Sequence, residues 1–225
     1  MTRHCTLSQL PTLPRHLTLS RKGSYMRLRR LAALSLTVLF LWPLDGSGQT
    51  EGPTLVTIAT SLGDIEISVD TVRAPNTAAN FLRYVTGRHY DGGEFFRSVT
   101  LDNQPNDEVK IEVIQARVNP ERIEDRFEAI PLERTDATGI YHVSGAISMA
   151  RGAPDSATSS FFICIGNQPS LDFGGARNPD GQGFAAFGRV ITGQDVVRLI
   201  QQQTADGQQL KPPMQIDSVT VTSQE

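Results

Sequence analysis

The sequence predicts an all-β protein, a closed eight-stranded antiparallel barrel capped by two helices. Short segments rich in β-branched and aromatic residues recur from Leu55 onward, and only two isolated segments have helical periodicity. The 19 glycines and 13 prolines supply the many turns that such a fold needs. Helices alternating regularly with strands would instead have favoured a parallel α/β sheet.

The first predicted elements are a β-hairpin and a helix. The hairpin strands cover residues 55–60 and 65–70, and in the second strand apolar residues alternate with polar ones, as expected for a barrel wall. A helix is predicted over residues 75–86, because Pro75 suits a first turn, apolar residues recur on one face and Gly87 ends the pattern.

The remaining elements are short strands and one more helix. That helix is predicted over residues 194–202, with Thr192 and Asp195 forming a pair like a capping box at its start. The last strand is predicted over residues 215–222. Five other strands are predicted over residues 94–99, 109–115, 146–150, 160–165 and 185–190.

The first 48 residues have the layout of a secretory signal peptide. A basic cluster that begins at Arg27 precedes an apolar run over residues 31–44, and small residues up to Gly48 follow. The run is shorter than the ~20 residues that cross a bilayer comfortably, so we expect cleavage, no stable membrane insertion afterwards and a periplasmic location. Met26 stands directly before the cluster, so translation could begin at Met1 or at Met26.

After this N-terminal extension, residues 1–48, we expect a linker over residues 49–54 and a single domain over residues 55–222. The first 48 residues hold seven Lys and Arg and one acidic residue, which leaves 14 basic and 23 acidic residues in the rest. A surface this acidic repels phosphate backbones, so nucleic acid is not expected as a partner. We expect a monomer.

Of the two cysteines, Cys5 would be removed with the signal peptide. Cys164 would then have no intramolecular disulfide partner. It lies in an apolar run, where we expect a buried and unreactive thiol.

Two neighbouring segments resemble the central signature of the cyclophilins. GAISMA at residues 145–150 is followed by SSFFIC at residues 159–164, where the family has "SMA" and then "SQFFI". Other matches follow the family's order along residues 55–222: FFR at 95–97 resembles "FHR", EVIQ at 112–115 resembles "FMxQ", FGRV at 187–190 resembles "FGKV", and GQDVV at 193–197 resembles the helix after it. The resemblance, to the bacterial exported type, implies peptidyl-prolyl cis-trans isomerase activity on proline-containing peptides and unfolded protein segments.

Several residues depart from the family pattern, and we expect them on the binding face. Glu112 replaces an aromatic residue, Val113 a methionine, Ser160 a glutamine, Ser170 a tryptophan and Phe184 a histidine. An extra acidic stretch over residues 101–110 should border the cleft and favour Lys or Arg near the proline. These departures bear on peptide preference and on catalytic rate.

The resemblance assigns catalysis to Arg97. Rotation about an Xaa-Pro bond faces a barrier of ~18–20 kcal/mol that arises from amide resonance, and no bond is broken. A catalyst therefore needs to favour the twisted amide, whose prolyl nitrogen gains a lone pair. A guanidinium stays protonated and can donate a hydrogen bond to it. On residue type alone, an arginine on a strand is more often a solvated surface residue.

Phe162 is expected to form the floor of the proline pocket, with Val113 and Leu171 as its walls. Alternatively, Phe161 and Phe162 could both be core residues. Neighbours on a strand point to opposite faces, however, so one of the two should leave the barrel interior.

Three further residues complete the expected binding site. The Gln115 amide would hold a substrate carbonyl, although a surface amide is equally compatible with the residue type. Ala150 would offer backbone groups to an extended peptide, and Phe184 should make the rim more apolar than is usual in the family.

The leading hypothesis is an exported isomerase that accelerates the folding of other exported proteins. The alternative is a weakly active or inactive binding module that acts as a chaperone, and the presence of Arg97, Gln115 and Phe162 favours the enzyme. A hydrolase that uses Ser159 or Ser160 has no support, because neither serine lies in a nucleophile elbow.

His89 and His142 lack the spacing of metal ligands or of catalytic triad partners, so we interpret both as structural or surface residues. No metal or organic cofactor is expected.

Overall fold

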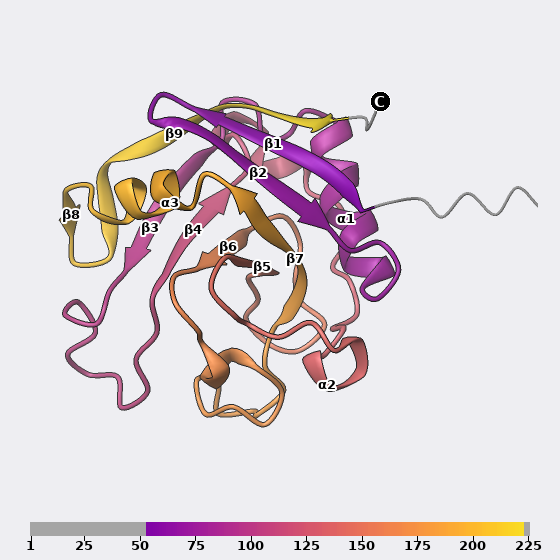
Figure 1. The fold of residues 1–225 in the computed structure, drawn as a ribbon, viewed down its shortest axis with the longest axis vertical. Coiled ribbons are helices and arrows are strands. Elements are labelled where there is room, and N and C mark those ends of the chain that lie inside the picture. Colours follow the sequence, from indigo (N-terminus) through magenta and orange to yellow (C-terminus); the bar gives the residue numbers. More distant parts are fainter. Residues whose placement is uncertain (1–52, 223–225) are drawn as a thin grey trace, which may run out of the picture. The chain divides into compact units, whose positions relative to one another are not determined.

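The structure, a computed structural model, describes residues 53–222. Eight antiparallel strands form a closed barrel in the order β1-β2-β7-β5-β6-β4-β3-β9, and β9 returns to pair with β1 (Figure 1). The predicted barrel is therefore confirmed. The strands are β1 Thr54–Thr60, β2 Gly63–Val69, β3 Glu94–Val99, β4 Val113–Arg117, β5 Ala146–Met149, β6 Phe161–Cys164, β7 Ala185–Thr192, β8 Ala205–Asp206 and β9 Gln209–Thr222. The predicted signal peptide and Cys5 lie outside the described residues.

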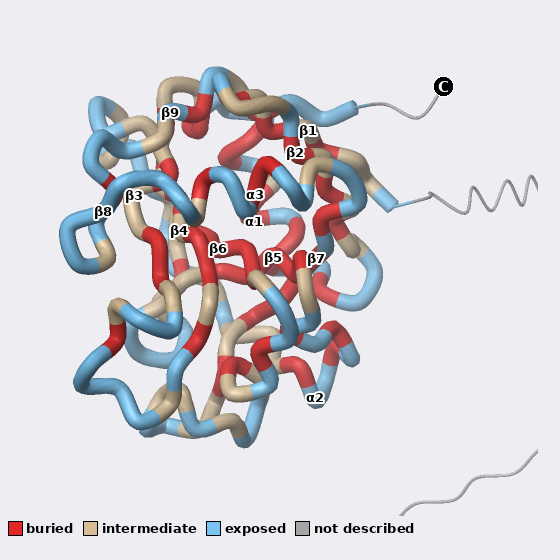
Figure 2. The backbone as a smooth tube through the Cα atoms, turned by 60° about the vertical axis from the view of Figure 1, so that its left-hand side comes forward, coloured by how far each residue is buried: buried red, intermediate tan, exposed pale blue. Residues whose placement is uncertain are grey.

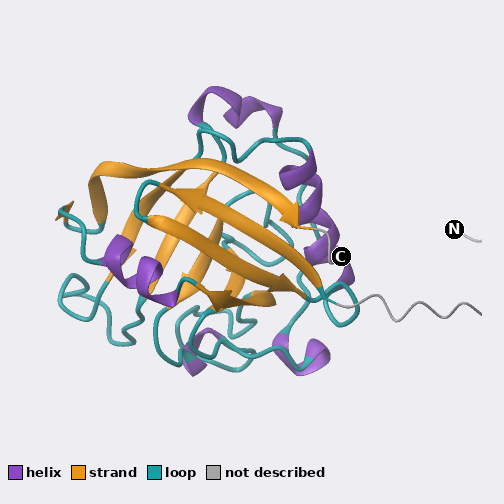
Figure 3. Cartoon of the chain, turned by 45° about the horizontal axis from the view of Figure 1, so that its top comes forward, coloured by secondary structure: helices purple, strands orange, loops and turns teal. Residues whose placement is uncertain are grey.

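Two of the three α-helices in the described range are the predicted ones. Helices α1 (Pro75–Thr86) and α3 (Gln194–Gln201) lie on opposite sides of the barrel (Figure 3). The third, α2 (Thr135–Thr138), is a single turn that the sequence pattern does not predict. None of the helices in the described part of the chain is long and apolar enough to span a bilayer.

The barrel interior holds the main core, which is continuous with the inner face of α1 (Figure 2). The alternation in β2 sends Ile65, Ile67 and Val69 into this core, as the sequence predicts. Phe81 of α1 packs against Phe161 at a ring-centroid distance of 5.5 Å, edge to face. This contact packs β6 against α1.

Strand β4 begins at Val113, so the predicted strand over residues 109–115 starts too early. The Gln104 side chain donates a hydrogen bond to the Ile111 carbonyl at 2.7 Å and accepts one from the Ile111 N–H at 3.2 Å. A buried amide side chain thus satisfies the backbone groups that a neighbouring strand would have paired. This contact, between residues seven positions apart in one loop, has no periodicity that a sequence pattern could reveal.

Strand β9 begins at Gln209, well before the predicted start at residue 215, and pairs with the unpredicted β8 in a hairpin. Pro212 and Pro213 interrupt the sequence pattern of a strand. The β3–β9 register shifts between Phe95 and Arg97, and this irregularity accommodates the two prolines.

The predicted capping box at α3 is wrong. The N-cap is Gly193, with a φ of 85°, and no side chain caps the helix. A Cβ on Gly193 would lie 2.2 Å from the Asp64 carbonyl oxygen, so the close approach of α3 to β2 requires glycine.

Gly193→Ala is expected to destabilise the protein by about 3 kcal/mol, because left-handed strain adds to the clash with the Asp64 backbone. Gly207 has a φ of 60°, but a Cβ added there would meet nothing within 4 Å, so Gly207→Ala should cost only about 1 kcal/mol. Urea unfolding of both variants and of Thr192→Ala measures this. A large loss of stability in Thr192→Ala would show that the Thr192 side chain does cap α3, which would contradict this interpretation.

Candidate active site

Three of the predicted site residues form a row across adjacent strands. Arg97 of β3 is the register partner of Gln115 on β4, and Gln115 is the partner of Phe162 on β6. Register partners on neighbouring strands project from the same face of a sheet. The antiparallel pairing therefore brings together residues far apart in the sequence.

Phe161 and Phe162 point to opposite faces, as predicted. Phe161 is fully buried in the main core, whereas Phe162 belongs to a second apolar cluster with Val113 and Leu171. Phe184 packs edge-on against Phe162, with ring centroids 5.3 Å apart. The outer face of the barrel thus carries its own apolar surface, in which Phe162 is 5% exposed.

This row and cluster line one pocket of about 200 Å³. All seven site residues predicted from the sequence lie in its lining: Arg97, Val113, Gln115, Ala150, Phe162, Leu171 and Phe184. Four further lining residues were not predicted: Ile111, Arg151, Arg177 and Asn178. We call this hollow the Phe162 pocket.

The Arg97 guanidinium is fixed by neutral amides. Its Nε and Nη2 donate to Gln208 Oε1 at 2.9 and 2.6 Å, and its Nη1 donates to Gln115 Oε1 at 3.0 Å. Burial, and then the charge of Arg177, lower the pKa of Arg97, and Asp107 opposes this shift. An arginine remains charged despite such a shift, so Arg97 is a rigid cationic donor.

Gln208 is a site residue that the sequence pattern does not reveal, because it lies in the unpredicted β8–β9 hairpin. Its own amide nitrogen donates to the Asn103 carbonyl at 3.1 Å, which orients the oxygen toward Arg97. The residue therefore acts through Arg97 as a positioning residue.

Gln115 and Ala150 each have one hydrogen-bonding group that is already used within the protein. Since the Gln115 oxygen accepts from Arg97, its amide nitrogen is the end left to donate to a substrate carbonyl. The Ala150 N–H donates to the Ser160 carbonyl at 2.8 Å. Of the Ala150 backbone groups expected to meet a peptide, only the carbonyl therefore remains.

A buried polar group lies behind the Phe162 ring, and it makes His142 a structural residue, one of the two roles expected from the sequence. His142 Nδ1 lies 2.7 Å from Asp172 Oδ1, and Nε2 lies 2.9 Å from Ser148 Oγ. The imidazole stacks on Phe162 at 5.9 Å with an interplanar angle of 15°. This connectivity is that of a catalytic triad, but Ser148 is 0% exposed and no substrate can reach it. His142 therefore supports the pocket floor.

The departures from the family pattern lie less often in the pocket than expected. Val113 and Phe184 line it, whereas Glu112, Ser160 and Ser170 do not. The same holds for the acidic stretch over residues 101–110, which reaches the pocket only indirectly, through contacts with Arg177, Gln208 and Ile111.

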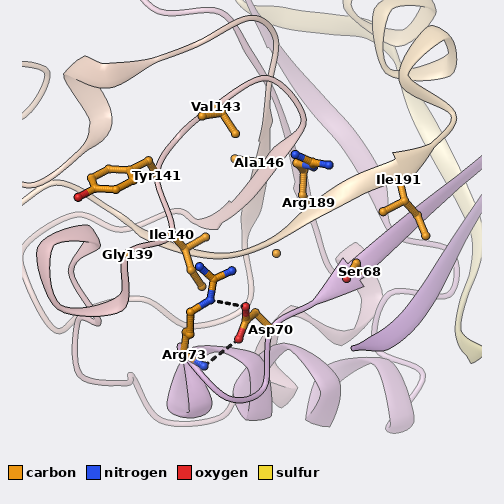
Figure 4. A pocket seen from close by; sticks show the side chains of 11 residues that line it. Ser68, Asp70, Arg73, Gly139, Ile140, Tyr141, Val143, Ala146, Arg189 and Ile191 are labelled. Atoms are coloured by element: carbon orange, nitrogen blue, oxygen red, sulfur yellow. Dashed lines mark hydrogen bonds and ion pairs between the residues drawn. The ribbon is translucent and has the colours of Figure 1, made fainter. Parts of the chain in front are cut away.

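A second hollow, of about 370 Å³, lies on another part of the barrel wall (Figure 4). Arg73, whose Nε donates to Asp70 Oδ2 at 2.7 Å, and Arg189 line it together with Tyr141 and Ile191. None of the predicted site residues lies there. It has more volume than the Phe162 pocket, but it lacks the convergence of an apolar floor with a partly buried, rigidly held cation.

Within the described residues, the other reactive side chains considered from the sequence are Cys164 and the possible metal ligands. Burial raises the pKa of the Cys164 thiol far above its usual value, as expected for an unreactive cysteine. Within residues 53–222, no group of three or more His, Cys, Asp and Glu side chains could hold a metal ion.

The sequence matches the family described as cyclophilin type peptidyl-prolyl cis-trans isomerase/CLD over residues 55–221. A peptidyl-prolyl cis-trans isomerase of Acinetobacter baylyi is 36% identical over 145 residues, covering 64% of this chain and 70% of the relative. Peptidyl-prolyl cis-trans isomerase A of Dickeya dadantii is 31% identical over 175 residues, covering 77% and 85%. A Cryptosporidium parvum cyclophilin type isomerase, crystallised in the presence of the dipeptide Ala-Pro, superposes with a TM-score of 0.60 at 19% identity, covering 76% of this chain and 99% of that chain.

Proposed function

The chain belongs to the cyclophilin-type peptidyl-prolyl cis-trans isomerases, and from that membership we propose that it isomerises Xaa-Pro bonds in the Phe162 pocket. The observation that carries this assignment is the row of Arg97, Gln115 and Phe162, which combines a rigid cationic donor, an amide and an apolar floor. The presence of Ala-Pro with the Cryptosporidium relative supports a proline-containing peptide as the ligand class.

In this proposal the substrate proline ring packs on Phe162, between Val113 and Leu171. Transfer of the apolar ring from water to the pocket is favourable, and the apolar pocket walls form no hydrogen bonds that the ring would have to replace. The Gln115 amide nitrogen donates to a substrate carbonyl and fixes the peptide on one side of the bond. The prolyl ring is then held while the preceding carbonyl rotates.

Arg97 supplies the interaction that differs between ground and transition states. In the planar amide the prolyl nitrogen has no lone pair to accept a hydrogen bond, whereas in the twisted amide it does. A guanidinium already held by Gln208 and Gln115 needs little reorganisation when this lone pair appears. The donor therefore lowers the rotation barrier more than it strengthens binding of either planar isomer. Isomerisation of a short Ala-Pro peptide, with and without the protein, tests the function.

The clients proposed for this enzyme are exported proteins, which need Xaa-Pro isomerisation while they fold outside the cytoplasm. The support is the sequence pattern of basic cluster, apolar run and small residues that ends near Gly48. A periplasmic enzyme of this kind would work on slow X-Pro steps, which take tens to hundreds of seconds without a catalyst.

We expect the mature protein to be trimmed near Gly48, since the apolar run is too short to serve comfortably as a permanent anchor. Intact-mass measurement on protein taken from its native compartment checks this. A mass that still includes residues 31–44 would contradict cleavage, and recovery of the protein with the cytoplasmic fraction would contradict export.

A further inference from the structure

Beyond isomerisation itself, we propose that the Phe162 pocket prefers Xaa-Pro segments with an acidic side chain next to the proline, bound by Arg177 and Arg97. This inference rests on the proposed position of the proline in the pocket. It replaces the sequence-based expectation that the acidic stretch over residues 101–110 would favour basic peptides.

The lining of the pocket is unusual for an acidic protein. Three of its eleven residues are arginines, and none is an aspartate or glutamate. Asp107, which belongs to the acidic stretch that the sequence placed near the cleft, pairs with Arg177 but does not line the pocket. The charged side chains that line the pocket are therefore all arginines.

Arg97 contributes a charge that no carboxylate of the described residues contacts. All three of its side-chain hydrogen bonds go to amide oxygens of Gln115 and Gln208, which are neutral. The proximity of Arg177 disfavours the charged state of Arg97, and an anion placed between the two guanidinium groups would relieve that repulsion.

Arg177 is held at the pocket by two loops. Its Nη1 donates to the Val109 carbonyl at 2.6 Å and lies 3.2 Å from Asp107 Oδ2, while its backbone N–H donates to the Ser170 carbonyl at 3.1 Å. The side chain is 14% exposed, and its other nitrogens have no acceptor within residues 53–222. Its position is thus fixed, and part of its donor capacity stays available.

The neighbouring Asn178 also lacks an acceptor. Its side-chain nitrogen is buried and makes no hydrogen bond with any described residue. A carboxylate bound at Arg177 would offer that amide an acceptor after a small side-chain rotation, and an unpartnered buried donor carries a cost that such a ligand removes.

Arg151, the third arginine of the lining, is already neutralised. Its Nη1 and Nη2 donate to the two carboxylate oxygens of Asp180 at 2.8 and 2.9 Å, and its Nε donates to the Gly183 carbonyl. Asp180 satisfies this fork with two parallel bonds, so Arg151 has little to offer a ligand. Arg177 makes only one contact with Asp107, and that contact is longer than either bond between Arg151 and Asp180. Arg177 is therefore the arginine that would select acidic peptides.

The test compares peptides with Glu, Gln or Lys directly before or directly after the proline, assayed on the full chain by NMR exchange so that no protease preference intervenes. At low salt, kcat/KM for the Glu peptide of at least one pair should exceed that of its Gln counterpart by about three- to tenfold, with Lys slowest. The difference should shrink in about 0.5 M salt, where the screening length is a few ångströms.

Arg177→Gln should bring the ratio of kcat/KM for the Glu and Gln peptides close to one, and Arg177→Lys should retain part of the difference. Arg189→Gln is the matched control, since this exposed arginine lies outside the pocket, and the preference should persist. Equal rates for Glu, Gln and Lys peptides, or a preference that survives Arg177→Gln, would overturn the inference while leaving isomerisation intact. Absence of catalysis on every peptide would instead refute the proposed function.

Discussion

Replacing Arg97 with alanine is expected to lower kcat roughly 10²–10³-fold while peptide affinity changes far less. The reason is that the guanidinium gains its acceptor only when the amide is twisted and the prolyl nitrogen has a lone pair. Removing the guanidinium therefore raises the energy of the transition state more than that of the bound substrate. Removing one preorganised donor from an oxyanion hole has an effect of this size. Steady-state kinetics on an Ala-Pro peptide, together with a titration of peptide binding, separate the two quantities.

Two companion variants make this prediction specific. Arg97→Lys keeps a positive charge but loses the planar fork that Gln115 and Gln208 hold, so it should recover only a small part of the activity. Arg189→Ala removes an exposed arginine elsewhere and should be fully active. If Arg97→Ala bound peptide poorly and turned over bound peptide normally, Arg97 would be a binding residue and not the catalytic donor.

Phe162→Ala is expected to lower affinity and turnover together. The variant loses the apolar floor under the proline ring in both planar isomers and in the twisted amide. A loss of about 2 kcal/mol of apolar contact corresponds to roughly 30-fold weaker binding. The ring also stacks on His142 and packs on Phe184, so its removal loosens the pocket and reduces kcat as well.

Phe162→Leu and Phe161→Ala are the controls for that result. Phe162→Leu keeps an apolar floor and should retain most of the affinity. Phe161→Ala empties a fully buried position of the main core and should instead cost about 3–5 kcal/mol of stability. Normal peptide affinity in folded Phe162→Ala would mean that the proline binds elsewhere.

The sequence selected residues that the fold brings together in the Phe162 pocket, but it did not reveal the contacts that surround them. Arg97, Gln115 and Phe162 could be selected because each lies in a segment that resembles the cyclophilin pattern. Alternation along a strand predicted that one of Phe161 and Phe162 would leave the barrel interior, and the resemblance selected Phe162. Both inferences depend on local sequence.

The parts that escaped prediction depend on polar side-chain contacts, some local and some between distant segments. Gln208 positions Arg97 from the β8–β9 hairpin, which was not predicted because two prolines interrupt the strand pattern. The Gln104 side chain replaces the strand pairing expected just before β4. His142 meets Asp172 and Ser148 only because three separate segments converge behind Phe162. Residue types and spacing carry no signal for such polar contacts.

Because sequence patterns do not reveal such pairing, the expected charge preference for the substrate also changed. From the sequence, the acidic stretch over residues 101–110 was the feature expected to attract basic peptides. In the folded chain Asp107 pairs with Arg177, and it is the arginine that faces the pocket. The sign of the local charge was set by pairing across two loops, which composition does not reveal.

Exchange NMR on one short Ala-Pro peptide tests the central claim most directly, because it measures isomerisation without a coupled enzyme. The unaltered full chain should produce strong cis–trans exchange cross-peaks, whereas Arg97→Ala, shown to be folded by its thermal melt, should shift the peptide resonances on binding but produce almost no exchange. Exchange by Arg97→Ala at a rate close to that of the unaltered protein would contradict the account, since the Phe162 pocket would then catalyse rotation without the donor assigned to the prolyl nitrogen.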